Sequence, residues 1–128
     1  VYFRDKFLGF DSGIYAGIRL LEILSNTNKS VEELLEGITR YCSTPEIKYK
    51  SSDDKKMEVI AKVEKYCQEK GYNINTIDGV RVTFPFGWAS VRASNTGPNI
   101  TARFEATTEE KLEEIKTEFE NLIIKYNN

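Results

Sequence analysis

Hydrophobic residues recur at helical spacing near the start of the chain. Between residues 11 and 24 they fall three or four positions apart, and the side chain of Asp11 or Ser12 can accept hydrogen bonds from the N–H groups of a first turn. Ser30 and Glu33 have the spacing of a capping box, which predicts a second, shorter helix. The apolar residues of the two predicted helices are Ile14, Ile18, Leu21 and Leu24, and then Leu34, Leu35 and Ile38.

A proline at position 45 marks a change of pattern. Pro45 has no backbone N–H group and biases Thr44 toward an extended conformation, which interrupts regular structure at this point. We therefore place a domain boundary in this connector. We expect 1–42 to be the end of one domain and 43–128 to be a second domain.

The second domain is predicted to begin with a strand and a helix. Residues 46–50 alternate as a short strand, and Ser51 or Ser52 then starts an amphipathic helix that Gly71 ends. Another capping box, Thr107 with Glu110, starts the final helix. The buried face of the first of these helices is predicted to hold Met57, Ile60, Ala61 and Cys67. The stripe of the final helix is Leu112, Ile115, Phe119, Leu122, Ile123 and Tyr126.

Between these helices, three segments alternate between apolar and polar residues. The inward positions are Val80, Val82, Phe84, Ala89, Val91, Ala93, Ile100, Ala102, Phe104 and Ala106. The other face is expected to hold Arg81, Thr83, Trp88, Ser90, Arg92, Thr101, Arg103 and Glu105. This pattern predicts an antiparallel sheet with one buried face. The fold class is therefore α+β, with two layers: about four strands and two helices on one sheet face.

Composition excludes several classes of site. The 128 residues include 18 Lys and Arg and 20 Asp and Glu, interspersed, so no broad basic face predicts a nucleic-acid or membrane partner. Histidine is absent, which excludes histidine-based catalysis within the chain. Cys42 and Cys67 cannot complete a usual zinc site and are expected to be reduced thiols of a cytoplasmic protein. The chain begins at Val1 inside a strand-like run, so we expect it to be a piece of a longer protein.

One loop concentrates groups that can bind an anion. Guanidinium groups match two phosphate oxygens, and hydroxyl, amide and backbone N–H groups can bond the others. Gly97 is expected to allow unusual dihedrals there. The spacing of these residues also allows a purely structural explanation, in which they are ordinary turn residues beside solvated arginines. The residues concerned are Arg92, Ser94, Asn95, Thr96, Gly97 and Pro98, with Arg103 on the next strand.

The loop and its surroundings resemble a known family. The stretch GVRVTFPFGWASVRASNTGPNITARFEATTEE is similar to the last domain of the alpha-phosphohexomutase superfamily, including its phosphate-binding loop. FLGFDSGIYAGIRLLEIL, starting at Phe7, resembles the end of the family's third domain, an α/β domain, and STPEI, starting at Ser43, resembles the connector between the two domains. Ser94-Asn95-Thr96 is typical of the bacterial phosphomannomutase and phosphoglucomutase type.

The resemblance implies a fold, a reaction and a set of site residues. The implied last domain is like the TATA-box-binding protein in fold. The family interconverts hexose 1-phosphates and 6-phosphates through a phosphoserine and a bisphosphate, with Mg²⁺ bound in other domains. This part would grip the phosphate that is not transferred. The implied phosphate ligands are Arg92, Ser94, Asn95, Thr96 and the Gly97 backbone, with Arg103 in support, and the implied hinge is Ser43, Thr44 and Pro45.

The family's catalytic elements are missing from these 128 residues. No Thr-Ala-Ser-His-Asn-Pro serine loop, Asp-Gly-Asp-Gly-Asp metal loop or Gly-Glu-x-Ser-Gly-His sugar loop occurs, so we expect no catalytic residue, no metal site and no turnover from this chain alone. The expected partners are a hexose phosphate, the parent enzyme's remaining domains and, through the uncovered helix near the start, a second copy of the chain.

Three alternatives stay open. The chain could be a complete module that binds an anionic metabolite, or the same domain of a phosphoglucosamine mutase. RNA binding is the third, and it predicts exposed aromatic residues on the polar sheet face, where only Trp88 is found.

Overall fold

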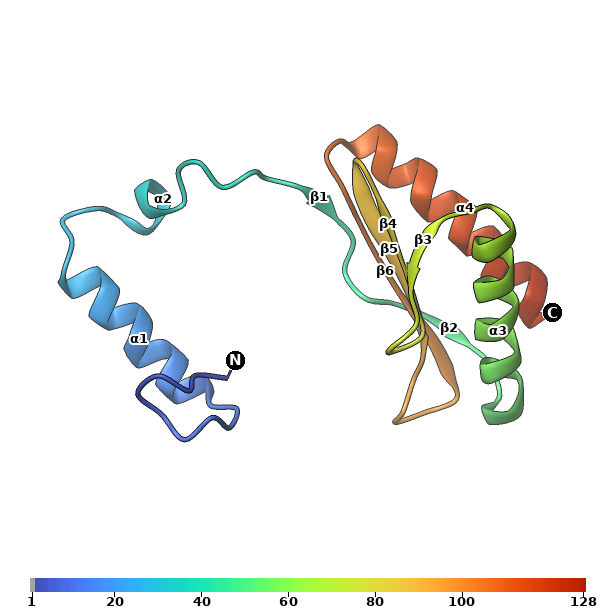
Figure 1. Ribbon diagram of the computed structural model, residues 1–128, viewed down its shortest axis with the longest axis horizontal. Coiled ribbons are helices and arrows are strands. Elements are labelled where there is room, and N and C mark those ends of the chain that lie inside the picture. Colours follow the sequence, from blue (N-terminus) through green and yellow to red (C-terminus); the bar gives the residue numbers. More distant parts are fainter. Residues whose placement is uncertain (1) are drawn as a thin grey trace. The chain divides into compact units, whose positions relative to one another are not determined.

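The computed structural model describes residues 2–128 and divides the chain into two compact units (Figure 1). The first unit ends at Thr39 and the second is Arg40–Asn128. No helix within residues 2–128 is long and apolar enough to cross a membrane.

The first unit contains the two predicted helices. Helix α1 is Gly13–Ser25, and the side chain of its N-cap, Ser12, accepts a hydrogen bond from the backbone N–H of Tyr15 at 3.2 Å. Helix α2 is Val31–Leu34, and the predicted capping box of Ser30 and Glu33 is present. No residue of α1 is buried, because this unit contributes no sheet for its apolar side to pack on.

The second unit is an antiparallel sheet of six strands, which confirms the α+β prediction. Their order is β1-β6-β5-β4-β3, with β2 also paired to β6. The strands are β1 Cys42–Ser43, β2 Ile47–Lys50, β3 Asn73–Asn75, β4 Val80–Phe84, β5 Gly87–Ala93 and β6 Asn99–Ala106. The pattern predicted about four strands because β1 and β3, at two and three residues, are too short to show alternation.

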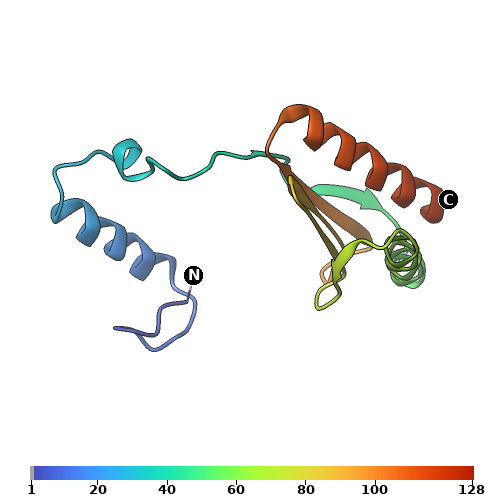
Figure 2. The ribbon, with the colours of Figure 1, turned by 45° about the horizontal axis from the view of Figure 1, so that its top comes forward.

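Two long helices cover one face of this sheet, as Figures 1 and 2 show. They are α3, Asp53–Glu69, and α4, Glu109–Asn127. The core between the layers holds the apolar strand residues together with Val59, Ile60, Val63, Cys67, Leu112, Ile115, Phe119, Leu122 and Ile123. The predicted face of α3 was partly wrong: Met57 and Ala61 are exposed, and Val59 and Val63 point to the sheet instead.

The ends of these helices follow local hydrogen-bonding rules. Ser52 caps α3, and the N–H groups of Gly71 and Tyr72 bond the carbonyls of Gln68 and Cys67, which is the Schellman pattern, with Gly71 at a φ of 68°. The predicted cap Thr107 was wrong by one residue. Its N–H donates to the Phe86 carbonyl at 2.8 Å, so it still belongs to the end of the sheet, and Thr108 is the N-cap of α4.

Candidate functional site

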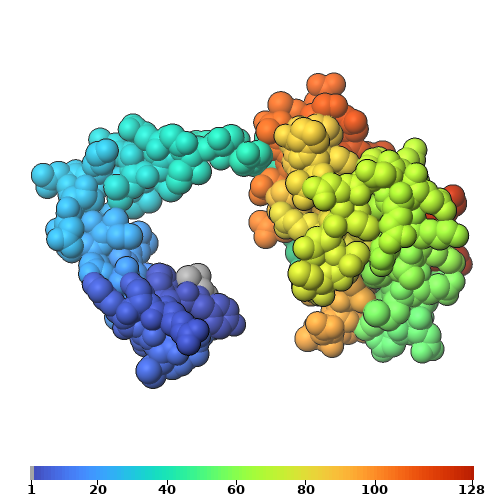
Figure 3. All heavy atoms as spheres, viewed as in Figure 1, coloured from blue at the N-terminus to red at the C-terminus, as the bar shows by residue number. Residues whose placement is uncertain are grey.

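The candidate anion-binding loop is the turn of the β5–β6 hairpin. Backbone bonds fix both of its ends: Ser94 N–H donates to the Asn99 carbonyl at 2.8 Å, and Asn99 N–H donates to the Gly97 carbonyl at 2.8 Å. Ser51 N–H, just before α3, donates to the Pro98 carbonyl at 2.9 Å. In the space-filling view the orange segment between β5 and β6 forms a lobe at the lower edge of the second unit (Figure 3).

The tip of the loop presents several unsatisfied donors. Ser94 Oγ and Thr96 Oγ1 lie 3.4 Å apart, and Thr96 N–H points to Ser94 Oγ at 3.3 Å. Within residues 2–128, the N–H groups of Asn95 and Gly97 have no hydrogen-bond acceptor. Because successive amides of a turn can converge on one anion, two free N–H groups beside two hydroxyls form a suitable cradle for a phosphate group.

Gly97 does not use the unusual dihedrals that were expected of it. It is absent from the described residues with positive φ, so the backbone there is open to any residue. A Cβ at this position would meet Asn99 Nδ2 at 3.2 Å, which is the end of a side chain that can turn away. The loop therefore depends on its backbone bonds and not on glycine's conformational freedom.

Arg92 lies beside the loop and is paired with an acid that the sequence analysis did not place in the site. Strand pairing puts Arg92 opposite Thr101, and its Nη2 donates to Glu46 Oε2 at 3.2 Å. The side chains of Arg92 and Glu46 are 35% and 44% exposed, so the ion pair is open to solvent and to exchange with another anion.

Arg103 lies on the same sheet face as Arg92. It is paired with Ser90 across the β5–β6 ladder, one diagonal step from Arg92, and it is exposed. A small cavity of about 30 Å³ lies between these residues, and the buried hydroxyl of Thr101 lines it without a hydrogen-bond partner. That volume suits one bridging water. Its lining is Glu46, Ser90, Arg92, Thr101, Ala102 and Arg103.

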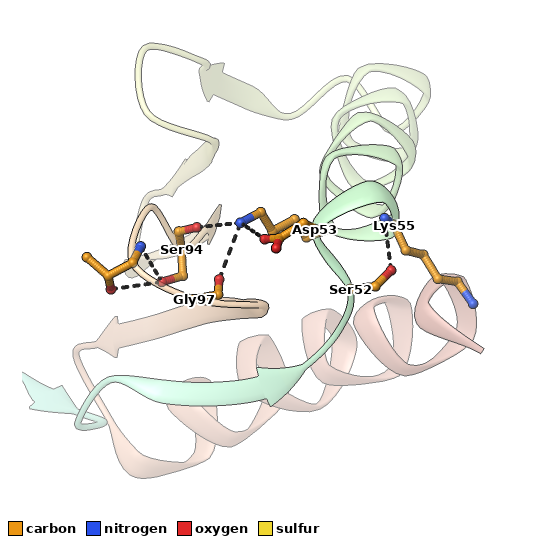
Figure 4. Close-up of polar contacts among 7 residues, drawn as sticks. Ser52, Asp53, Lys55, Ser94 and Gly97 are labelled. Atoms are coloured by element: carbon orange, nitrogen blue, oxygen red, sulfur yellow. Dashed lines mark hydrogen bonds and ion pairs between the residues drawn. The ribbon is translucent and has the colours of Figure 1, made fainter.

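The loop is also bound by a lysine of α3 that no sequence motif indicated. Lys56 Nζ donates to the carbonyls of Ser94 at 2.8 Å and Gly97 at 3.3 Å, and it pairs with Asp53 Oδ1 at 2.6 Å (Figure 4). Lys56 follows Lys55 on a charged helix, so only the fold distinguishes it from a solvated lysine.

The predicted hinge residues lie against the sheet of the second unit. Ser43 is part of β1, opposite Glu105. Thr44 N–H donates to the Phe104 carbonyl at 3.0 Å, and Phe104 N–H donates to Thr44 Oγ1 at 3.1 Å. Pro45, exposed, follows directly. The hinge role of these three residues stays a prediction.

Trp88 occupies the polar sheet face. Its Nε1 donates to Glu105 Oε1 at 3.0 Å, and the Arg81 guanidinium lies 4.1 Å from the ring centroid. One face of the indole is therefore occupied by a cation. A base or a sugar could stack there only by displacing the Arg81 guanidinium.

Neither the cysteines nor the acidic residues form a metal or redox site. Both Cys42 and Cys67 are free thiols, and burial raises the pKa of Cys67 to about 12. Among residues 2–128, no three His, Cys, Asp or Glu side chains are grouped so that they could hold a metal ion.

Comparison with known proteins places this geometry in a family. The family model described as phosphoglucomutase/phosphomannomutase, C-terminal domain, matches residues 46–122, which is more than half of the chain. The chain belongs to this family. The match includes β2, the loop, α3 and most of α4, so every candidate phosphate ligand lies inside the family domain.

Individual relatives extend the match to the first unit. A phosphomannomutase/phosphoglucomutase of Pseudomonas aeruginosa is 47% identical over 121 residues, covering 94% of this chain and 26% of the relative. A phosphoglucomutase of Neisseria meningitidis serogroup B is 42% identical over 126 residues, covering 94% and 26%. A crystal structure of a phosphoglucomutase/phosphomannomutase family protein from Burkholderia thailandensis superposes with a TM-score of 0.80 at 36% identity, covering 98% and 26%. The chain thus spans about a quarter of the length of these relatives.

Proposed function

We propose that this chain is the phosphate-gripping part of a hexose phosphate mutase that interconverts 1-phosphates and 6-phosphates of mannose or glucose. The loop 92–97 binds the phosphate that is not transferred, while the phosphoserine and the magnesium site lie in other domains. The chain itself then turns over no substrate. The contribution of this chain is to bind and orient the substrate.

One observation carries the proposal: the loop combines free backbone donors with side-chain donors within four consecutive residues, 94–97. The N–H groups of Asn95 and Gly97 lack acceptors within residues 2–128, and Ser94 and Thr96 contribute hydroxyls. Arg92 adds a guanidinium that can exchange its present acid, Glu46, for a phosphate. Arg103 is exposed one step away and supplies further positive charge.

The mechanistic role is orientation. Binding energy from a phosphate remote from the reacting atoms can hold the sugar in place and drive closure of the site. Each charge-assisted hydrogen bond contributes about 1.5 to 3 kcal/mol, so after the cost of association this loop alone binds more weakly than about 0.1 mM. The remaining affinity and the choice of sugar then come from the other domains. Motion would occur around the connector of Ser43, Thr44 and Pro45.

The proposal is tested by ³¹P line broadening of inorganic phosphate, glucose 6-phosphate and mannose 6-phosphate as the chain is added. We expect all three to bind with affinities within about threefold of each other, because the loop contacts only the phosphate. Arg92→Ala should abolish the broadening. Arg81→Ala, which removes the same charge from the same sheet face, should leave it unchanged. If both variants lost the broadening equally, phosphate binding would depend only on the net charge of the chain, and the proposal would fail.

A further inference from the structure

The side chain of Lys56 is mostly shielded from solvent, although it lies in the first turn of α3 next to the exposed Met57. Its side chain is 13% exposed, and lysine is rarely buried to this extent unless its ammonium is paired. The three N–H donors of the ammonium meet three acceptors, Asp53 Oδ1 and the carbonyls of Ser94 and Gly97. Two of these bonds tie α3 to the loop, and the third, to Asp53, lies within the first turn of α3.

These contacts orient one particular peptide group. The carbonyl of Ser94 and the N–H of Asn95 belong to the same planar trans peptide, so they point in opposite directions. Because Lys56 draws the Ser94 carbonyl toward α3, the Asn95 N–H faces away from α3, toward the open side of the loop. This is one of the two amides that have no acceptor within the described chain.

The second carbonyl contact fixes the other end of the turn. Gly97 is followed by Pro98, which has no N–H, so the contact of Lys56 with the Gly97 carbonyl holds the backbone in place but orients no further donor. Figure 4 shows Ser94, Gly97 and Asp53 around the same ammonium. Together the two contacts hold both ends of the four-residue turn against α3.

We propose that Lys56 is a positioning residue for the phosphate loop. It makes no contact with phosphate and acts by setting the orientation of the Ser94–Asn95 peptide before the ligand arrives. This inference rests on the proposed function of the loop. It adds that α3, an element outside the loop, fixes the orientation of the loop backbone before phosphate binds.

Lys55 provides a matched control. It is the preceding residue on the same helix, and its Nζ donates to a main-chain oxygen of the last residue, Asn128, at 2.8 Å. The two lysines therefore have the same charge and each bonds a main-chain oxygen, but only Lys56 contacts the loop. Replacing either by methionine removes one charge and keeps most of the aliphatic stem.

The test measures phosphate affinity and the loop's resonances in the isotope-labelled 128-residue chain. For Lys56→Met we expect affinity for inorganic phosphate to fall about tenfold, which is about 1.4 kcal/mol. We also expect the ligand-free variant to differ from the wild type in the ¹³C carbonyl chemical shifts of Ser94 and Gly97 and in the amide chemical shift of Asn95. Lys55→Met should keep affinity within about twofold and leave these resonances in place.

The outcomes separate this inference from the function on which it rests. If wild-type chain does not bind phosphate, the proposed function fails. If wild type binds and Lys56→Met binds equally well, or if Lys55→Met loses as much affinity, only the positioning role is overturned. Should Lys56→Met not fold, Lys56→Gln takes its place with the same expected direction, and unchanged affinity in that variant overturns the inference.

Discussion

In the proposed site Arg92 is paired with Glu46, which we expect to compete with a phosphate ligand. Their side chains are 35% and 44% exposed, and such an ion pair is worth at most about 1 kcal/mol. A phosphate must displace this contact to form a bidentate pair with the guanidinium. The resting structure thus holds the arginine in place at a small cost in affinity.

Glu46→Gln is expected to strengthen phosphate binding about two- to fivefold, because the amide cannot hold the guanidinium as a carboxylate does. The measurement is a phosphate titration followed by NMR. Glu105→Gln is the matched control, since it removes the same charge from the same sheet face, where it bonds Trp88. Equal gains in both variants, or a loss in Glu46→Gln, would contradict the competition.

Titration of buried phenols and thiols should destabilise the second unit at alkaline pH. Burial raises the pKa of Tyr72 to about 12, and the hydrogen bond from its hydroxyl to Glu118 Oε1 at 2.9 Å adds to the shift. Burial also raises the pKa of Cys67 to about 12. The unfolded chain loses these protons first, near pH 9 for the thiol and pH 10 for the phenol.

The free energy of unfolding is therefore expected to be at its highest below about pH 9 and to fall as the pH rises toward 12. Urea unfolding at a series of pH values measures this slope. Tyr72→Phe should make the decline between pH 10 and 12 shallower, because one titrating group is removed. A flat profile over this range, or an unchanged slope in the variant, would show that burial of these groups does not control alkaline stability.

Among the elements, the start of α4 gives the sharpest test of the fold. Thr108 accepts from the Lys111 N–H at 3.2 Å, whereas the Thr107 N–H is part of the sheet's hydrogen bonding. Thr108→Ala should lower the free energy of unfolding by about 0.5 to 2 kcal/mol, the usual cost of losing an N-cap. Thr107→Ala should change it by less than about 0.5 kcal/mol. Urea denaturation of both variants measures these changes. A larger loss of unfolding free energy in Thr107→Ala would show that Thr107, the residue predicted from sequence, is the N-cap.

The elements also show where sequence patterns suffice. Alternation over five to eight residues located β4, β5 and β6, and the stripe of α4 was correct because a long helix repeats its period several times. Helix α3 was placed on the wrong face in part, since its charged residues leave few apolar positions to define the stripe. Strands β1 and β3 were missed because their formation depends on pairing with distant strands.

Some residues of the candidate site could be predicted from the sequence, and others could be found only from the fold. Loop composition and family resemblance indicated Arg92 and Ser94–Thr96, because anion-binding groups are dense there. Glu46 and Lys56 lie 46 and 38 residues away from their loop partners, and no local pattern connects such positions. Only the three-dimensional pairing of β2, α3 and the hairpin brings them together.

For the whole molecule, the first unit poses a problem of stability. Helix α1 leaves Ile14, Ile18 and Leu21 exposed at 83%, 55% and 65%, in an apolar stripe without a sheet of its own. The relatives are about four times as long as this chain, so further domains can cover such a face in them. In the isolated chain we expect the stripe to be covered by a second copy of the chain.

Sedimentation and hydrogen exchange test that expectation. The chain should form dimers that dissociate on dilution, with slowed amide exchange across Gly13–Ser25 in the dimer. Leu21→Glu should abolish the dimer and the protection, and Glu22→Gln, on the same helix turn, should not. Concentration-independent monomers with rapid exchange in α1 would contradict it.

We propose that loop 92–97 binds phosphate without help from other domains. The most informative experiment follows the backbone amide resonances of the 128-residue chain as inorganic phosphate is added to about 20 mM, a range that detects even a contact of about 2 to 3 kcal/mol. We expect saturable shifts concentrated at Asn95 and Gly97, smaller ones at Ser94 and Thr96, and none in Arg92→Ala. Shifts spread evenly over the charged surface, or none at the loop, would contradict it.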